Sequence, residues 1–461
     1  MKTRSWLGLS ALLALTAPAI AQPTAPAVAA DDPSAFDKAL DALFVQGGLT
    51  ADAAAARASK ASPSVRRKMA EVDAAIAQGE QAELARVPQV GAKLSYTRLS
   101  PLDPIMFGTI AIPFILNNYV AEANLVVPLS DYVLRYPKLI DAAHYAEDVA
   151  KVSKRASELA AGEDARLAFY EWVRARLQVL IADSQLSQIQ VTLKQMRALA
   201  DAQRLSKADL LRFESQEAQA EQTEDQLKNL AELREEQLRM LIGAPDAEAL
   251  AIGEDIRQEL SVPGMASKLD DLMAAAKQKR LDFKTLDLGI LAKDKQRQSE
   301  KASLYPRLSA FATTDYANPN QRVFPQSEKF TFTWAAGVQL TWTLNDNLNA
   351  QTTDRRLIAE TNELRADREN LERGTRIEVL AATQAVAIAQ HALTTSQKGL
   401  VAAQEGYRVR QALLAAERAT AVELVDAETD LTRARITALN ARVDLRVALA
   451  QLEHALGNDA K

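Results

Sequence analysis

Hydrophobic and polar residues alternate one by one along residues 330–345, and this period of two predicts a β-strand. The even positions carry Phe330, Phe332, Trp334, Ala336, Val338, Leu340, Trp342 and Leu344. A soluble strand usually has five or six residues, whereas a tilted strand that crosses a membrane needs about nine to eleven and a water-exposed extension. The segment is therefore predicted to be a membrane strand. A long hairpin strand in a soluble β-sandwich is the alternative.

Three further segments alternate more weakly and are predicted to be partner strands: residues 90–100, 119–129 and 308–316. Residues 101–118 and 317–329 would be the connecting loops. The smallest stable membrane barrels use about eight strands, and open sheet edges in lipid would leave backbone groups without partners. The four strands of one chain must therefore be pooled between copies. Two copies would give eight strands and three would give twelve, and strand counting does not choose between these numbers.

Most of the remaining chain has the period of long helices. Residues 131–203 contain no proline after Pro137, and a helix of that length would span on the order of 100 Å. Leucine and alanine occupy two heptad positions of the last helix, which lets two helices pack closely. The first position has Leu424, Leu431, Ala438, Leu445 and Leu452, and the second has Ala427, Ala434, Ala441, Ala448 and Ala455. Two antiparallel coiled-coil hairpins are predicted, with turns near residues 203–207 and 415–420.

The two halves of the chain resemble each other. Five pairs of residues lie 214 positions apart: Leu210 and Leu424, Glu214 and Glu428, Ala220 and Ala434, Leu238 and Leu452, Gly243 and Gly457. Upstream, Pro88 and Pro306 are 218 positions apart, and Asp131 and Asp346 are 215 positions apart. Small differences in loop length explain this drift. The chain is therefore predicted to contain two tandem copies of one structural unit.

This duplication sets the predicted organisation. The first repeat covers residues 48–260, with a helix, a β-hairpin over 88–130 and a long helical hairpin over 131–243. The second repeat covers residues 261–461, with a helix, a β-hairpin over 305–345 and a long helical hairpin over 346–457.

The start of the chain has the features of a secretory signal, predicted over residues 1–21. Lys2 and Arg4 form the charged start, an apolar stretch follows, and small residues precede Gln22. Residues 22–47 begin with a Pro/Ala tract and are predicted to be a flexible segment. The chain has no cysteine, which excludes disulfides, thiolate metal sites and lipidation through a thiol. No later window has about 20 uninterrupted apolar residues, so a membrane span would have to consist of strands.

Charge and motifs exclude several function classes. The net charge of −5 and the pI near 5.6 give no basic surface for nucleic acid. The histidines His144, His391 and His454 stand singly on helical segments without metal-ligand spacing, and are interpreted as solvated helix residues. No nucleophile elbow, phosphate loop or zinc motif is present. The chain is therefore predicted not to be an enzyme and to bind no metal or cofactor.

Several segments resemble the TolC family of outer-membrane efflux proteins, most specifically "TAVELVDAETDLTRARITALNARVDLRVALAQLEHALG". The resemblance also includes "VPQVGAKLSY", "YPRLSAFATT" and "VVPLSD", and covers about residues 48–457. It implies a mixed α/β membrane protein: a homotrimer whose twelve pooled strands form an outer-membrane β-barrel, continued by a long periplasmic α-helical coiled-coil barrel. It further implies a passive duct, contacting outer-membrane lipid, for which a periplasmic adaptor protein and an inner-membrane transporter supply contact and energy.

The resemblance also implies functional residues at the closed end of the helical tunnel. An acidic pair past the second turn lines the constriction in the family, and Glu423 and Asp426 occupy these positions. Asp209 is the equivalent acid of the first repeat. Rings of such acids would favour cations. The alternative is that acids at helix starts only stabilise the helix dipole.

The turns themselves differ from the family. Well-studied members carry a glycine-containing motif there for docking the adaptor, but residues 203–205 and 416–418 contain no glycine. The predicted docking residues are Arg204, Leu205, Ser206, Glu417 and Arg418. The arginine that links neighbouring hairpins in the closed state of such members would fall at Ala419, one residue after Arg418. The adaptor class and the lock of the closed state therefore stay open.

A second function remains compatible with the pattern, namely a periplasmic coiled-coil scaffold with a soluble β-cap and no pore. Within the channel interpretation, drug, metal-ion and protein export are all open. The seven methionines are scattered, so nothing favours soft-metal export.

Overall fold

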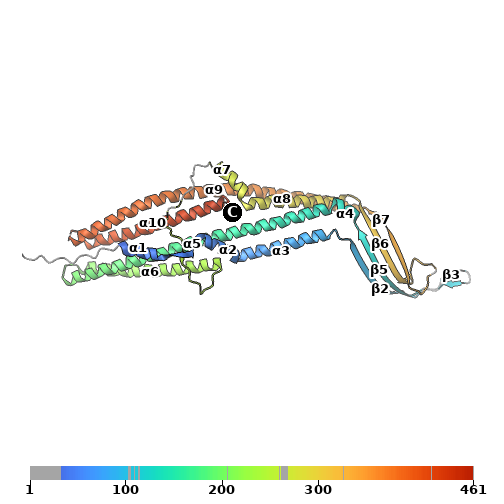
Figure 1. Cartoon of the computed structure of the whole chain (residues 1–461), viewed down its shortest axis with the longest axis horizontal. Coiled ribbons are helices and arrows are strands. Elements are labelled where there is room, and N and C mark those ends of the chain that lie inside the picture. Colours follow the sequence, from blue (N-terminus) through green and yellow to red (C-terminus); the bar gives the residue numbers. More distant parts are fainter. Residues whose placement is uncertain are drawn as a thin grey trace, which may run out of the picture.

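The computed structural model describes residues 33–101, 105–107, 110–112, 115–204, 206–258, 260, 268–324, 326–416 and 418–459. The chain is strongly elongated: a shaft of long helices carries a four-stranded sheet at one end (Figure 1). The predicted signal, residues 1–21, lies outside the described residues. None of the described helices is long and apolar enough to cross a membrane.

Two short helices, two long strands and two long helices follow one another in the same order in both halves, and the first half has further short elements. The helices are α1 (Pro33–Leu43), α2 (Ala51–Ala61), α3 (Pro63–Leu84), α4 (Leu129–Leu134), α5 (Tyr136–Asp201), α6 (Lys207–Ile242), α7 (Leu269–Lys279), α8 (Leu281–Glu300), the 3-10 turn η1 (Lys301–Leu304), α9 (Leu344–Ala415) and α10 (Ala421–Ala455). The strands are β1 (Phe44–Leu49), β2 (Gln89–Arg98), β3 (Ile105–Phe107), β4 (Ile110–Ile112), β5 (Asn117–Val127), β6 (Arg307–Asn318) and β7 (Thr331–Thr341).

The main sheet is antiparallel with the order β2-β5-β6-β7, and each predicted strand is present. The strand predicted over residues 330–345 is too long, because β7 ends at Thr341 and α9 begins at Leu344. The alternation continues by chance into a helix start, where Thr343 is the N-cap residue and Asp346 lies in the first turn. The loop predicted over 101–118 contains a small hairpin of β3 and β4, which pairs isoleucine-rich segments.

The two faces of the sheet differ in chemistry. One face is apolar, and its large side chains are far from buried: Val90 is 78% exposed and Leu94 is 86% exposed. Trp334 and Leu340 of β7 lie on the same face. The other face is polar, with Lys93 of β2 directly opposite Glu122 of β5. An exposed apolar face of this extent indicates contact with a nonpolar medium or partner.

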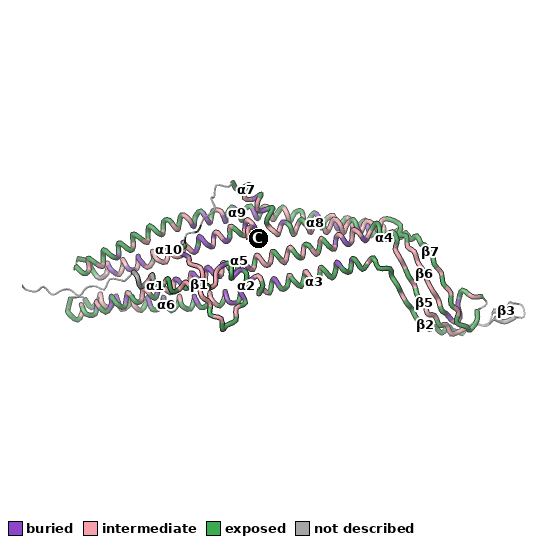
Figure 2. The backbone as a smooth tube through the Cα atoms, in the orientation of Figure 1, coloured by how far each residue is buried: buried purple, intermediate pink, exposed green. Residues whose placement is uncertain are grey.

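The shaft consists of two antiparallel helical hairpins, α5–α6 and α9–α10. The turns fall at residues 202–206 and 416–420, as predicted. The predicted leucine and alanine seam is confirmed, since Leu424, Leu431 and Leu445 are buried against α9 and Ala441 and Ala448 are buried too. Figure 2 shows buried positions along the helices of the shaft and a sheet that is mostly exposed or half-buried. The hairpins are therefore held by their seams.

Residues 33–47 correct one prediction, because they form α1 and the start of β1 rather than part of a flexible segment. Leu40, Leu43 and Phe44 pack against a buried apolar cluster that includes Phe169 and Trp172 of α5. β1 also forms parallel bridges to Ile252. The Pro/Ala tract before this amphipathic helix led to the prediction of a flexible segment. The helix depends on tertiary packing for its stability, which the local sequence does not show.

Candidate functional site at the hairpin tips

The second tip begins α10 with a capping box. The hydroxyl of Thr420 accepts a hydrogen bond from the backbone N–H of Glu423 at 3.3 Å, and the carboxylate of Glu423 accepts one from the N–H of Thr420 at 3.3 Å. Two backbone donors that lack helical partners are thereby satisfied. Glu423 therefore caps α10, and its place in the constriction stays a prediction.

Glu423 also makes an ion pair across the hairpin. Arg410 of α9 donates to its carboxylate at 3.0 Å, with both side chains a little under half exposed. Glu423, Asp426 and Asp430 line one groove between α9 and α10, together with Arg410 and Tyr407. Among the described residues, none pairs with the carboxylate of Asp426. Of the two predicted constriction acids, Asp426 is therefore the one whose charge is not compensated by a described neighbour.

The first tip has the same backbone geometry. Arg204 N–H donates to Leu199 O at 2.9 Å, and Arg418 N–H donates to Leu413 O at 2.8 Å in the second tip. Ser206 caps α6: its hydroxyl accepts from the N–H of Asp209 at 3.1 Å and donates to the carboxylate of Asp209 at 2.6 Å. Asp209 is therefore bound to its cap residue, like Glu423.

The side chains behind the two tips differ. Behind the first tip Leu193, Met196 and Phe213 form a buried apolar cluster. Met196 and Arg410 are equivalent positions, 214 residues apart, so the second tip has an ion pair where the first has an apolar contact. Leu414 and Val425 of the second hairpin pack against the apolar cluster of the first. The two tips are therefore in direct contact.

A hydrogen bond joins the hairpins further along the shaft. The amide of Gln188 on α5 donates to the hydroxyl of Tyr407 on α9 at 2.6 Å. Sequence reasoning did not find Gln188, Tyr407 or Arg410. Arg410 lies five residues before the predicted turn and Glu423 three residues after it, and their opposite charges are a signal that could have identified the pair.

The predicted docking residues lie at the extreme end of the shaft. Arg204, Ser206 and Arg418 are exposed, while Leu205 and Glu417 lie outside the described residues. The three described positions lie in two turns, each at the end of its own hairpin.

One histidine differs from the prediction that the histidines are solvated. His454 is half-buried, with its Nδ1 2.7 Å from Asp459 and its Nε2 3.1 Å from Glu163 of α5. The hydrogen bond with Asp459 raises the pKa of His454. Desolvation raises the pKa of Glu163. In the described part of the chain, no group of three or more His, Asp or Glu side chains could hold a metal ion.

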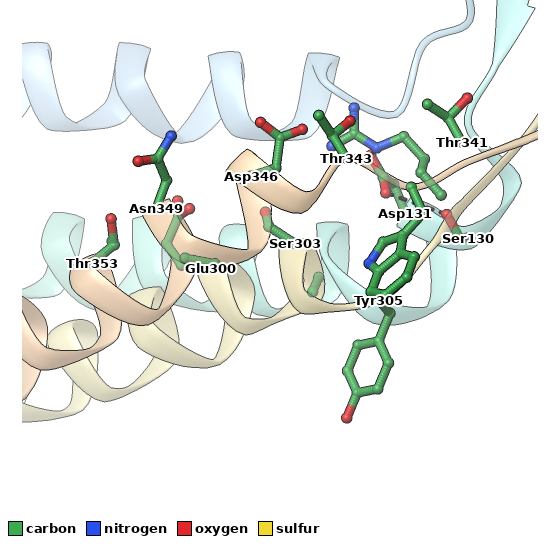
Figure 3. A pocket seen from close by; sticks show the side chains of 14 residues that line it. Ser130, Asp131, Glu300, Ser303, Tyr305, Thr341, Thr343, Asp346, Asn349 and Thr353 are labelled. Carbon is green, nitrogen blue, oxygen red and sulfur yellow. Dashed lines mark hydrogen bonds and ion pairs between the residues drawn. The ribbon is translucent and has the colours of Figure 1, made fainter.

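A second polar site lies where the sheet meets the shaft, in a cleft of about 340 Å³ (Figure 3). Asp131 of α4 is buried there, with its carboxylate 3.5 Å from Nε of Arg307 at the start of β6. Ser130 accepts a hydrogen bond from the backbone N–H of Leu308 at 3.2 Å. Asp346 lies on the first turn of α9 and is exposed. The cleft is therefore closed on the Asp131 side and open at Asp346.

Comparisons with known proteins agree with this architecture. Residues 272–458 match the family model described as outer membrane efflux protein. No curated protein matches the chain by sequence. The structure is similar to that of CusC, whose crystal structures concern folding and transmembrane channel formation: TM-score 0.75 and 16% identity, covering 90% of this chain and 93% of that chain.

Two further solved structures are comparable. The outer membrane protein VceC of Vibrio cholerae has a TM-score of 0.72 and 16% identity, covering 88% of this chain and 96% of that chain. The MtrE outer membrane channel of Neisseria gonorrhoeae, in its open state, has a TM-score of 0.72 and 16% identity, covering 89% of each chain. At these identities the likeness establishes the fold, which is the one predicted.

Proposed function

We propose that the chain is a member of the outer membrane efflux protein family, whose model matches residues 272–458, and that it is the passive outer-membrane exit duct of a tripartite efflux or type I secretion system. This assignment agrees with the resemblance seen in the sequence. The family consists of channels rather than enzymes. In the proposed role the protein conducts substrates from an inner-membrane transporter across the periplasm and the outer membrane, and the transporter supplies the energy.

The observation that carries this proposal is the sheet. It has one apolar and one polar face, and within the described residues its outer strands β2 and β7 each have only one neighbour. Lipid requires every backbone group to be paired, so these edges need partners. Three copies would supply twelve strands and close a barrel with the polar faces inward and the apolar faces toward outer-membrane lipid.

The shaft supports the periplasmic part of the proposal. α9 has 72 residues, which corresponds to about 108 Å of helix. Six helical hairpins from three copies would enclose a tunnel of this length. Its far end would be formed by the tips, where we place the constriction at Asp426, Glu423 and Asp209. The periplasmic adaptor would dock on the exposed turns that contain Arg204, Leu205, Ser206, Glu417 and Arg418.

The proposal is tested on the full chain in outer-membrane fractions. The protein should resist extraction by carbonate and high salt, migrate as an oligomer in detergent without boiling, and conduct ions in planar bilayers after purification. Extraction by carbonate together with monomeric migration would overturn it and favour a coiled-coil scaffold with a soluble β-cap. Co-purification of an adaptor and an inner-membrane transporter tests the assignment to a tripartite system.

A further inference from the structure

The two repeats make the same contact at the base of the sheet. In the first repeat the hydroxyl of Tyr132 donates a hydrogen bond to the backbone carbonyl of Arg86. In the second repeat the amide of Asn347 donates to the backbone carbonyl of Leu304 at 3.3 Å. The donors are 215 positions apart and the acceptors 218 positions apart. The duplication therefore extends to individual hydrogen bonds at this end of the shaft.

The strand registers obey the same two offsets. Gln89 lies opposite Val126 in the first hairpin, and Arg307 lies opposite Thr341 in the second. The first members of these pairs are again 218 positions apart and the second members 215. The two hairpins are consequently equivalent residue by residue, and a contact seen at one can be transferred to the other.

The end of the first repeat is joined to the start of the second within the chain. β5 pairs with β6, Asp131 pairs with Arg307, and Ser130 accepts from the N–H of Leu308. The end of the second repeat has no such neighbour in the described structure: β7 is an edge strand, and no described residue pairs with the carboxylate of Asp346. Figure 3 shows Asp346 among the residues that line the cleft.

We propose that β2 of a second copy closes this cleft and places its Gln89 against Asp346. Gln89 lies 218 positions before Arg307, and Asp346 lies 215 positions after Asp131. Gln89 and Asp346 are therefore the equivalents, in the other repeat, of the ion pair between Arg307 and Asp131. This inference rests on the proposed assembly around one pore, and adds the register and the chemistry of the junction. The transferred register puts Leu340 of β7 opposite Leu94 of the second copy, and both residues belong to the apolar face. A shift by one residue would place apolar side chains on the polar face.

The junction between copies therefore differs chemically from the junction within a chain. Arg307 offers a charged guanidinium to Asp131, whereas Gln89 offers a neutral amide N–H to Asp346. A guanidinium can make two parallel charge-assisted hydrogen bonds to a carboxylate, and an amide cannot. The intersubunit junction is accordingly the weaker one and the less sensitive to salt.

Cysteine cross-linking tests the register, because the natural chain has no cysteine. Ser95→Cys with Gln339→Cys should form a disulfide between chains, since the transferred register makes these polar-face positions directly opposite. The matched intrachain control is Asn124→Cys with Thr313→Cys, an observed opposite pair. Ser95→Cys with Thr341→Cys, displaced by two residues, should react much more slowly. Oxidation of the control without any interchain product would overturn the proposal.

The outcome also separates this inference from the proposed function. A product series that ends at three chains supports both. A series that ends at two chains supports the junction and refutes the trimer. If the protein cross-links efficiently but does not conduct ions, the channel function is refuted and the proposed junction stands. If the oligomer conducts ions but cross-links only in the displaced pair, the proposed junction alone is refuted.

The chemistry of the junction is tested by Gln89→Arg. This variant recreates the charged pair of Arg307 and Asp131 between copies, so the temperature at which the oligomer dissociates in detergent should rise, and high salt should remove the gain. Adding Asp346→Asn should abolish the gain at low salt. An unchanged dissociation temperature in Gln89→Arg, or a gain that survives Asp346→Asn, would show that Gln89 does not meet Asp346.

Discussion

The two acids beyond the second tip should respond differently to neutralisation. Glu423 caps α10 and pairs with Arg410, whereas Asp426 has no partner among the described residues. We therefore expect Glu423→Gln to loosen the tip and Asp426→Asn to change ion selectivity while the tip stays closed. Arg410→Gln and the double variant Arg410→Gln/Glu423→Gln complete a double-mutant cycle.

The size of the structural effect follows from the geometry. Arg410 and Glu423 are 3.0 Å apart, but 45% and 44% of their side chains are exposed, so solvent screening limits the pair to about 0.2–1 kcal/mol. Glutamine keeps an oxygen that can accept from Thr420 N–H, but the loss of charge at the helix start costs about 0.3–1 kcal/mol more. Glu423→Gln should thus cost about 1 kcal/mol, Arg410→Gln about half as much, and the double variant no more than Glu423→Gln.

Hydrogen exchange of the tip amides in the purified oligomer measures this opening. A cost of about 1 kcal/mol corresponds to roughly fivefold faster exchange of residues 416–425, because 1.4 kcal/mol is a factor of ten. Asp426→Asn is the matched control and should leave this exchange unchanged. Additive effects of Arg410→Gln and Glu423→Gln would show that the ion pair is not formed in solution.

Selectivity is measured on the same variants in planar bilayers. Three uncompensated charges within a screening length of about 10 Å of a narrow axis raise the local cation concentration severalfold. Asp426→Asn should therefore lower the cation-to-anion permeability ratio at low salt and have little effect near 1 M salt. The division of roles is refuted if Asp426→Asn speeds exchange at the tip, or if the permeability ratio depends on Glu423 alone.

Two further predictions concern the middle of the shaft. The pKa of His454 is raised by its hydrogen bond with Asp459, so the folded protein holds this proton more tightly than the unfolded chain. Protonated His454 stabilises the folded protein fully below the unfolded pKa of about 6.5, and this stabilisation is lost as the pH rises through the higher folded pKa. Thermal stability should therefore fall across this pH range. His454→Gln should flatten this dependence of thermal stability on pH. Gly243 has φ +64°, and a Cβ there would lie 2.6 Å from an alanine methyl of α2. Gly243→Ala should cost at least 1 kcal/mol in thermal unfolding, whereas Gly374→Ala in the open interior of α9 should gain about 0.4–1 kcal/mol; equal effects of the two substitutions would refute the strain argument.

The strands and helical hairpins could be predicted because each depends on a local period. The alternation around Trp334 and the heptads from Leu424 both reflect one buried or lipid-facing side of an element. Where two signals overlap, the period fails: Trp342 continues the alternation of β7, but Thr343 already caps α9. The end of β7 was therefore placed too late, because the cap competes with the strand over the same residues.

The contacts between hairpins could not be predicted from periodicity. Gln188 and Tyr407 are 219 positions apart, and their hydrogen bond depends on how the two hairpins are rotated against each other. The same holds for His454 and Glu163, which are brought together by α5 and the end of α10. A single polar residue on a helix carries no signal that identifies its partner on another helix.

The duplication explains where the two hairpins should differ in mobility. The first tip rests on the buried apolar side chains of Leu193, Met196 and Phe213. The second has Tyr407 and Arg410 at the positions equivalent to Leu193 and Met196, so a half-exposed ion pair replaces one apolar contact beside the buried cluster of Tyr407, Leu424 and Leu431. Separating apolar side chains costs about 25 cal/mol per Å² of exposed surface, whereas a screened ion pair loses little when it meets water. Opening of the tunnel should therefore begin at the second hairpin, which also carries the uncompensated charge.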